Sequence, residues 1–128
     1  MLNKEIVHKE REDLREKIRS LSDENRSKFY TEYDKVVKDP DTYAVLNWFF
    51  LVGIHHFYLG NWLRGTINLT CMLFGLFIFS FERGALSAVG GIILFLIFLI
   101  EIYALFRSEI IVQDFNNQEM RKVLKELK

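Results

Sequence analysis

Two histidines and one glutamate are the residues of this chain whose types could do chemistry in apolar surroundings. His55 and His56 are adjacent, and Glu101 lies in an otherwise apolar segment much later in the chain. Adjacent residues on a helix point about 100° apart, so the two imidazoles are poorly placed to chelate one ion. No cysteine, aspartate or further histidine lies beside them at ligand spacing. We therefore expect no metal site, and we expect the histidines to hydrogen-bond backbone or lipid headgroups.

Glu101 needs a partner or water, because an ionisable side chain within an apolar segment is costly and usually faces protein or water. Its candidate partners are Arg64, Arg83, His55 and His56. Because Glu101 lies near the end of its segment, solvation at the membrane interface is an alternative. Other polar groups available for hydrogen bonds between helices are Asn47, Asn68 and Thr70.

The sequence contains no pattern typical of an enzyme. No nucleophile elbow, P-loop, dinucleotide fingerprint or zinc signature occurs. We therefore expect no catalytic residue, no cofactor and no small-molecule substrate. The lone Cys71 excludes an intramolecular disulfide, and the zero net charge gives no reason to expect nucleic-acid binding.

Charge is distributed very unevenly along the chain. Residues 43–106 carry only four formal charges, whereas the 42 residues before them carry 21. The apolar block divides into three segments, 43–63, 66–81 and 85–106. About 20 apolar residues cross a bilayer as a helix, and no apolar/polar alternation suggests a barrel. We predict an all-α integral membrane protein with two to three apolar helices, a glycine/aromatic bend and amphipathic cytoplasmic helices; a buried bundle in a soluble protein is the alternative.

Three parts follow from this distribution: a charged arm (1–41), a membrane domain (42–106) and a polar tail (107–128). In the arm we expect helices over 2–20 and 23–38. Ser22 is a good N-cap for the second of these, and Pro40 is suited to start the next helix. In the tail, Asn116-Asn117 marks the expected helix start.

Both water-facing parts carry an apolar stripe that is too short to be stable alone. The arm stripe is Leu14, Ile18, Leu21, Phe29, Tyr33 and Val36. The tail stripe is Met120, Val123, Leu124 and Leu127. The arm stripe could be covered by its own hairpin, the tail, a second copy or the membrane surface. A membrane-surface helix is normally basic, and the arm has balanced charge, so protein contact is favoured.

A glycine-bounded, aromatic-rich block interrupts the first apolar segment. It resembles the signature of the two-transmembrane (TM2) domain family: glycine, one residue, His or Asp, a basic residue or His, then Phe-Tyr-Leu-Gly and a later glycine. The matching positions are Gly53, His55, His56, Phe57, Tyr58, Leu59, Gly60 and Gly65. Glu101 occupies the place of an acid found near the end of the family's last segment. The flanks, including Phe115-Asn116, resemble those of bacterial members.

The resemblance has two departures and implies no reaction. Leu51-Val52 stand where a Gly-Gly pair is frequent, and the stretch from Gly65 to Glu101 is longer than in compact members. The family has no general biochemical activity, so the resemblance implies a class of membrane protein. It also implies that 43–63 spans the bilayer, whereas we favour a re-entrant or strongly tilted segment beside a 66–81/85–106 hairpin.

These observations predict a non-catalytic anchor or assembly subunit. Lys35, Lys38 and Arg107 flank the apolar block, which favours a plasma (inner) membrane location with both tails cytoplasmic. Besides membrane lipid, we expect the partners to be further copies of the chain or a larger membrane complex. The alternative function is a small oligomeric channel or transporter that uses Glu101 with His55 and His56.

Overall fold

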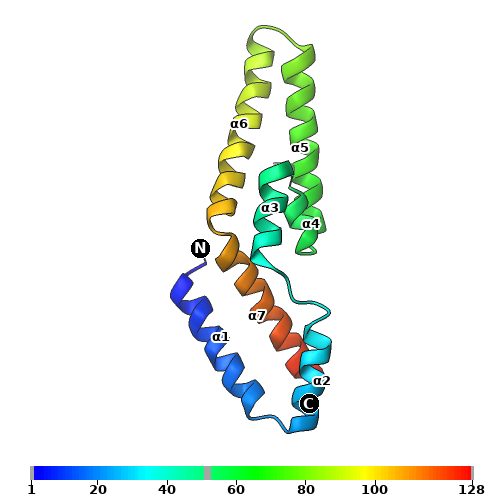
Figure 1. The fold of residues 1–128 in the computed structure, drawn as a ribbon. Coiled ribbons are helices and arrows are strands. Elements are labelled where there is room, and N and C mark those ends of the chain that lie inside the picture. The colour runs from blue at the N-terminus through cyan, green and yellow to red at the C-terminus, as the bar shows by residue number, and fades with distance from the viewer. Residues whose placement is uncertain (1, 51–52, 128) are drawn as a thin grey trace. The chain divides into compact units, whose positions relative to one another are not determined.

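The computed structural model describes residues 2–50 and 53–127, and in that part every regular element is a helix. The chain forms two compact units: the first consists of residues 1–40 with 109–128, and the second of residues 41–108. The all-α prediction is confirmed. The arm and the tail, which we treated as separate parts, lie in the same unit. The helices shown in Figure 1 are α1 (Lys4–Arg19), α2 (Asp23–Tyr33), α3 (Pro40–Phe50), α4 (Ile54–Tyr58), α5 (Trp62–Phe81), α6 (Ala85–Phe106) and α7 (Ser108–Glu126).

The first unit has its own hydrophobic core, built from α1, α2 and α7. Its buried members are Leu14, Ile18, Phe29, Met120 and Val123, with Leu21, Tyr33, Leu124 and Leu127 packed against them. The arm and tail stripes therefore cover each other, which accounts for most of the apolar surface for which we expected a partner. Burial raises the pKa of the Tyr33 phenol, because it disfavours the charged phenolate.

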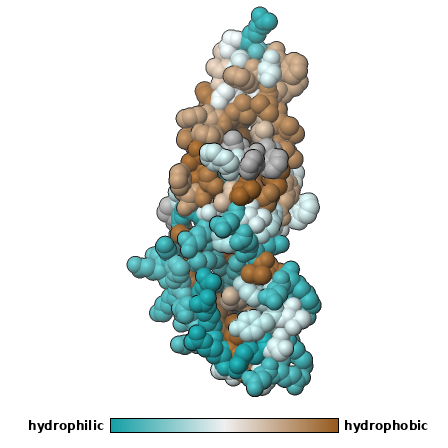
Figure 2. Space-filling view, in the orientation of Figure 1, coloured by the Kyte–Doolittle hydropathy of each residue, from teal (hydrophilic) through white to brown (hydrophobic). Residues whose placement is uncertain are grey.

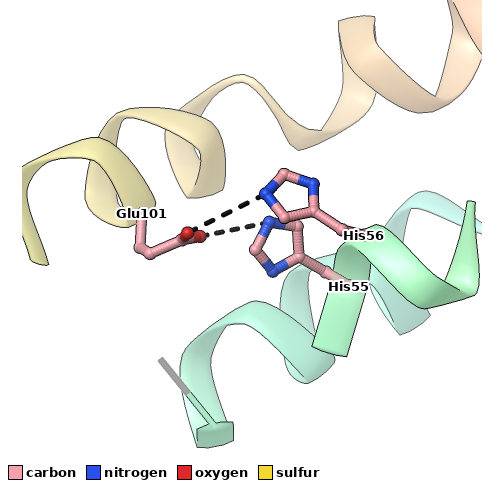
Figure 3. Close-up of side chains that lie close together, drawn as sticks. All are labelled: His55, His56 and Glu101. Atoms are coloured by element: carbon pink, nitrogen blue, oxygen red, sulfur yellow. Dashed lines mark ion pairs between the residues drawn. The ribbon is translucent and has the colours of Figure 1, made fainter. Parts of the chain in front are cut away.

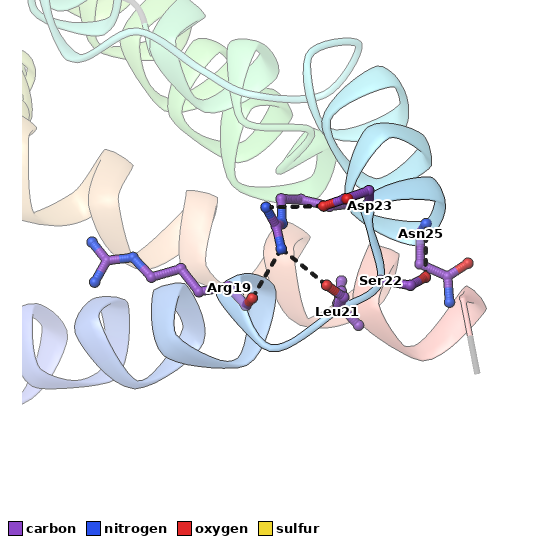
Figure 4. Close-up of polar contacts among 6 residues, drawn as sticks. Arg19, Leu21, Ser22, Asp23 and Asn25 are labelled. Atoms are coloured by element: carbon purple, nitrogen blue, oxygen red, sulfur yellow. Dashed lines mark hydrogen bonds and ion pairs between the residues drawn. The ribbon is translucent and has the colours of Figure 1, made fainter.

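The turn between α1 and α2 is closed by side chains that satisfy exposed helix ends (Figure 4). The Ser22 hydroxyl accepts a hydrogen bond from the Asn25 backbone N–H at 3.4 Å, as predicted for an N-cap. Arg26 Nη2 donates to the carbonyls of Arg19 at 3.1 Å and of Leu21 at 3.0 Å. The Arg19 carbonyl lies in the last turn of α1, where a helix leaves its acceptors free, and the Leu21 carbonyl belongs to the turn that follows.

The predicted start of the tail helix at Asn116-Asn117 was wrong, because α7 begins at Ser108. Both asparagines lie inside the helix and make long-range hydrogen bonds. The Asn116 side chain accepts from the Lys38 N–H at 2.9 Å and donates to the Lys38 carbonyl at 2.8 Å. The fully buried Asn117 donates to the Val7 carbonyl at 2.9 Å. The pair therefore ties the tail to both ends of the arm.

The second unit contains two helices that are long and apolar enough to cross a membrane. They are α5, with 20 residues, and α6, with 22 residues. At 1.5 Å per residue each spans about 30 Å, the thickness of the hydrocarbon core. They lie side by side, joined through Gly84, whose φ is +66°, and Figure 2 shows the apolar surface that covers them. Many large apolar side chains on both helices are exposed, which suits contact with lipid.

Segment 43–63 is not a single helix. Pro40 begins α3, as predicted, and α3 has 11 residues, while α4 has only five. At 1.5 Å per residue neither helix reaches across a bilayer. Residues 51 and 52 lie outside the described residues. The partial crossing of this segment stays a prediction.

A close backbone contact holds α5 and α6 together at two glycines that we had not singled out. A Cβ on Gly90 would lie 2.6 Å from the Phe79 backbone nitrogen and 2.8 Å from the Gly75 carbonyl oxygen. Small residues allow this approach between membrane helices. Glycines within both apolar segments were the only sequence signal for this contact. They do not show which glycine of one helix faces which glycine of the other.

We predict that Asn117→Ala lowers the free energy of unfolding by about 1–3 kcal/mol, because the Val7 carbonyl loses its buried donor. Gln118→Ala, at an exposed neighbouring position, is the control and should change stability little. Unfolding of the full-length protein in mild detergent, followed by circular dichroism, measures both. Equal stability of the two variants would show that the buried hydrogen bond does not hold the tail.

We also predict that Gly90→Ala destabilises the α5–α6 hairpin by about 1–3 kcal/mol through overpacking against backbone. Gly91→Ala is the matched control, since its Cβ would lie 3.5 Å from the Phe79 ring, an ordinary contact. Thermal unfolding in the same detergent compares the two. A Gly91→Ala loss as large as that of Gly90→Ala would contradict the close contact.

Candidate functional site

The Gly53–Gly60 block forms a short helix with a specific ending. Gly53 precedes α4 with φ of +80°, and Gly60 follows it with φ of +71°. The Gly60 N–H donates to the Phe57 carbonyl at 2.9 Å, and the Asn61 N–H donates to the His56 carbonyl at 2.8 Å. This pair of hydrogen bonds, with glycine in the left-handed conformation, is a Schellman motif. The Phe-Tyr-Leu-Gly part of the signature is thus a helix stop.

Two other glycines of the signature bring the bend close to α5. A Cβ on Gly65 would lie 2.7 Å from the Phe57 ring, and a Cβ on Gly53 would lie 2.7 Å from Asn68 Nδ2. A Cβ on Gly60 would have nothing within 4 Å, so glycine is needed there only for its backbone conformation. The three glycines therefore have three different reasons to be small.

The bend places both histidines against Glu101 of α6 (Figure 3). His55 Nε2 lies 3.1 Å from Glu101 Oε2, and His56 Nε2 lies 3.9 Å from Oε1. His55 and Glu101 are 0% and 1% exposed, respectively. The expectation that Glu101 pairs with a polar group of another segment is met by the histidines. In the part of the chain that the structure describes, no contact to Arg83 is seen.

Two asparagines fix the orientation of Glu101. Asn68 Nδ2 donates to Glu101 Oε1, and Asn47 Nδ2 donates to the Glu101 backbone carbonyl at 3.0 Å. The sequence had identified both as polar groups available between helices. It did not identify Tyr43, which is buried and packs edge-on against the His55 ring with 5.0 Å between the ring centroids. No periodicity in the sequence points to that contact.

The site lies near one end of the α5–α6 hairpin. Glu101 is five residues from the end of α6 at Phe106, which is about 8 Å along the helix. Exposed aromatic residues are present at this end, among them Trp62 at the start of α5 and Tyr103 on α6. Such residues are typical of the membrane interface. The site is therefore close to the interface, although His55 and Glu101 are almost fully buried.

Glu101 lines two cavities of the second unit. One, of about 370 Å³, is also lined by His56, Arg64 and Cys71. The other, of about 180 Å³, is lined by Asn47 and Trp48. Polar groups at a cavity wall can bind an ion or a small polar ligand, so the cluster has room for chemistry beyond an ion pair.

Comparison with known proteins supports the resemblance seen in the sequence. Residues 37–82 match the family model of the TM2 domain. The match covers the whole bend and α5, and it ends before α6 and Glu101. No curated protein and no solved structure matches the chain. The bacterial type of the member stays a prediction.

We predict that the cost of replacing Gly60 does not depend on side-chain size. Gly60→Ala and Gly60→Leu should each lower stability by about 1–2 kcal/mol, because both strain the left-handed backbone and a Cβ at this position has nothing within 4 Å. Gly60→Asn should be milder, since asparagine tolerates this conformation. At Gly65, by contrast, leucine should be far worse than alanine. Unfolding in detergent measures the series; a graded loss with size at Gly60 would refute the conformational explanation.

Proposed function

We propose that this chain, which carries a TM2 domain at residues 37–82, is a non-catalytic membrane anchor that presents a folded helical unit to a protein partner. The TM2 domain and the two apolar helices make it a membrane protein. The role of anchor rests on the first unit, which has a core of its own and is charged on its surface.

The observation that carries the proposal is an apolar groove with a basic rim on this unit. The groove has a volume of about 470 Å³, and its apolar lining includes Leu21, Leu124 and Leu127. Lys17, Arg121 and Lys125 also line it, and no acidic residue does among those described. The unit as a whole has balanced charge, so this local excess of positive charge is a property of the groove.

The groove chemistry fits an acidic amphipathic helix of another protein. Such a helix places an apolar ridge in the groove and acidic residues at the rim. Arg121 is paired with Glu10, whereas Lys17 and Lys125 make no ion pair with a described residue. A concave groove suits a helix better than a flat lipid surface, and the balanced charge of the unit gives anionic lipid little attraction.

Two full crossings would leave both polar parts of the chain on the same side of the membrane. Lys35, Lys38 and Arg107 lie next to the apolar block, and positive residues in such positions favour the cytoplasmic side. We therefore assign the partner to the cytoplasm and the anchor to the plasma membrane.

A small channel or transporter is the second candidate, and one observation favours it. Glu101 lines both cavities of the second unit, so a proton or ion could pass from one to the other by way of its carboxylate. Ion flux into liposomes that contain the purified protein, lost in Glu101→Leu, would favour transport over anchoring.

The anchor proposal predicts a specific crosslink in cell membranes. A photo-crosslinking amino acid at Ser20, which lines the groove, should capture one protein through a helix with an acidic and an apolar face. Lys17→Glu with Lys125→Glu should lower the yield about tenfold, a loss of ~1.4 kcal/mol of binding. Exchanging acids for lysines on the captured helix should restore it.

Lys9→Glu, on the same helix but outside the groove, is the matched control and should leave the yield unchanged. A crosslinker at position 9 should capture nothing specific. Adducts between two copies of the chain, adducts with lipid, or a yield that ignores the charge reversal would each contradict the proposed partner.

A further inference from the structure

We propose that His55, His56 and Glu101 bind a divalent transition-metal ion of the zinc class, as two imidazole ligands and one carboxylate ligand. The site lies in the second unit and is independent of the groove, so it stands or falls separately from the proposed anchor function.

The first support is the convergence of the three ligand atoms. One nitrogen of each imidazole and a carboxylate oxygen of Glu101 all lie within 4.8 Å of one another. In a tetrahedral site with metal–ligand distances of 2.0–2.1 Å, neighbouring ligand atoms are ~3.3 Å apart. His55 Nε2 lies 3.1 Å from Oε2 of Glu101, and His56 Nε2 lies 3.9 Å from Oε1 of the same carboxylate. Small side-chain rotations would complete the shell.

The second support is the position of the two imidazole rings. The sequence led us to expect neighbouring rings that point apart, but in the structure they lie close together. α4 is little more than one turn, and the two ring centroids are 4.1 Å apart with an angle of 46° between the planes. Figure 3 shows both rings directed toward the Glu101 carboxylate. The third ligand is an acid on another helix, Glu101; the sequence named the histidines as its possible partners but could not show that all three groups converge.

The third support is a set of buried polar atoms that lack hydrogen-bond partners among the described residues. They are both nitrogens of His55 and Oε2 of Glu101. His55 Nε2 and Glu101 Oε2 are 3.1 Å apart yet form no hydrogen bond with each other. Buried polar groups are normally satisfied, so these atoms call for an explanation. A cation between them would coordinate both atoms and balance the buried carboxylate charge.

The surroundings resemble the outer shell of a metal site. Asn68 donates to Glu101 Oε1, and the Tyr43 ring packs against His55, so both ligands are held in place. Partners of this kind orient ligands and tune metal affinity. Two of the three ligands are imidazoles, which suit zinc, cobalt or nickel better than magnesium or calcium.

The fourth coordination position would face the cavity of about 370 Å³ that His56 and Glu101 line. A site with three protein ligands and one open position is typical of zinc that binds water or a further ligand. Arg64 also lines this cavity, and its positive charge would favour an anionic fourth ligand. The Cys71 thiol lines the cavity as well and is the nearest competing ligand type, which the test must separate.

The test uses the full-length protein, purified in mild detergent through a tag without histidine and stripped with a chelator. Zinc titration by calorimetry should show one ion per chain, and cobalt should give the visible absorption of a tetrahedral site. His56→Gln and Glu101→Gln should each lower affinity at least ~100-fold, because even outer-shell changes cost 10–100-fold. Asn68→Ala should lie within that ~10–100-fold range.

Two matched controls separate this site from other metal-binding groups. His8→Gln removes a histidine of α1, and Cys71→Ser removes the thiol at the cavity wall. Both should bind zinc as the wild type does. Absence of binding to the wild type, unchanged affinity in His56→Gln, or loss in either control would overturn the proposal.

A measurement on the wild-type protein tests the same ligands without relying on variants, which could fail to fold. X-ray absorption of the cobalt-loaded wild type should show imidazole nitrogens and oxygen in the first shell. A shell with sulfur, or one made of oxygen alone, would contradict the assignment.

Discussion

The second unit depends on burying one carboxylate. Glu101 on α6 contacts His55 and His56 at the bend and accepts from Asn68 on α5. A charged side chain left alone costs ~2.5–3.5 kcal/mol or more at mid-membrane and less toward the interface, where Glu101 lies. The broken segment that supplies the histidines has a second requirement. Its backbone N–H and C=O groups need hydrogen-bond partners within the protein, because lipid offers none. The cluster answers the first requirement and joins the bend to the hairpin, and the hydrogen bonds from the Gly60 and Asn61 N–H groups answer part of the second.

The signature glycines make this arrangement possible. Gly60 ends α4 in a conformation that other residues resist, and Gly65 leaves room for the Phe57 ring. Together they turn the chain so that α4 and α5 lie against each other. At the far side of α5, Gly75 and Gly90 allow α6 to approach closely enough for Glu101 to reach the bend. The small residues thus allow the helices to approach each other closely, and this approach brings the polar side chains of the cluster into contact.

The first unit is stabilised by apolar packing, as a soluble helical domain is. Its stripes are too short to be stable as isolated helices, and they become stable by packing on each other across the length of the chain. Asn116 and Asn117 add directional contacts that apolar packing cannot supply. Part of the packed apolar surface stays accessible in the groove, which is why we place partner binding there and not on the buried stripe.

Much of this fold was predictable from the sequence, because hydropathy, caps and proline act locally. The apolar block, the Ser22 cap and the Pro40 helix start are of this kind. The start of α7 was missed because asparagine favours helix caps, whereas Asn116 and Asn117 serve distant backbone groups. The convergence of both histidines on Glu101 was missed because Glu101 reaches them only after three helices are packed. Long-range pairing leaves no local pattern.

A double-mutant cycle tests the central claim, that Glu101 holds the bend to the hairpin through His55. The free energy of unfolding of the full-length protein would be measured for Glu101→Leu, His55→Leu and the double variant, in detergent with chelator present. The account predicts a coupling of about 1–3 kcal/mol, the range for residues in direct contact within one network. Additive effects, with coupling near zero, would show that the bend and the hairpin are joined by something else.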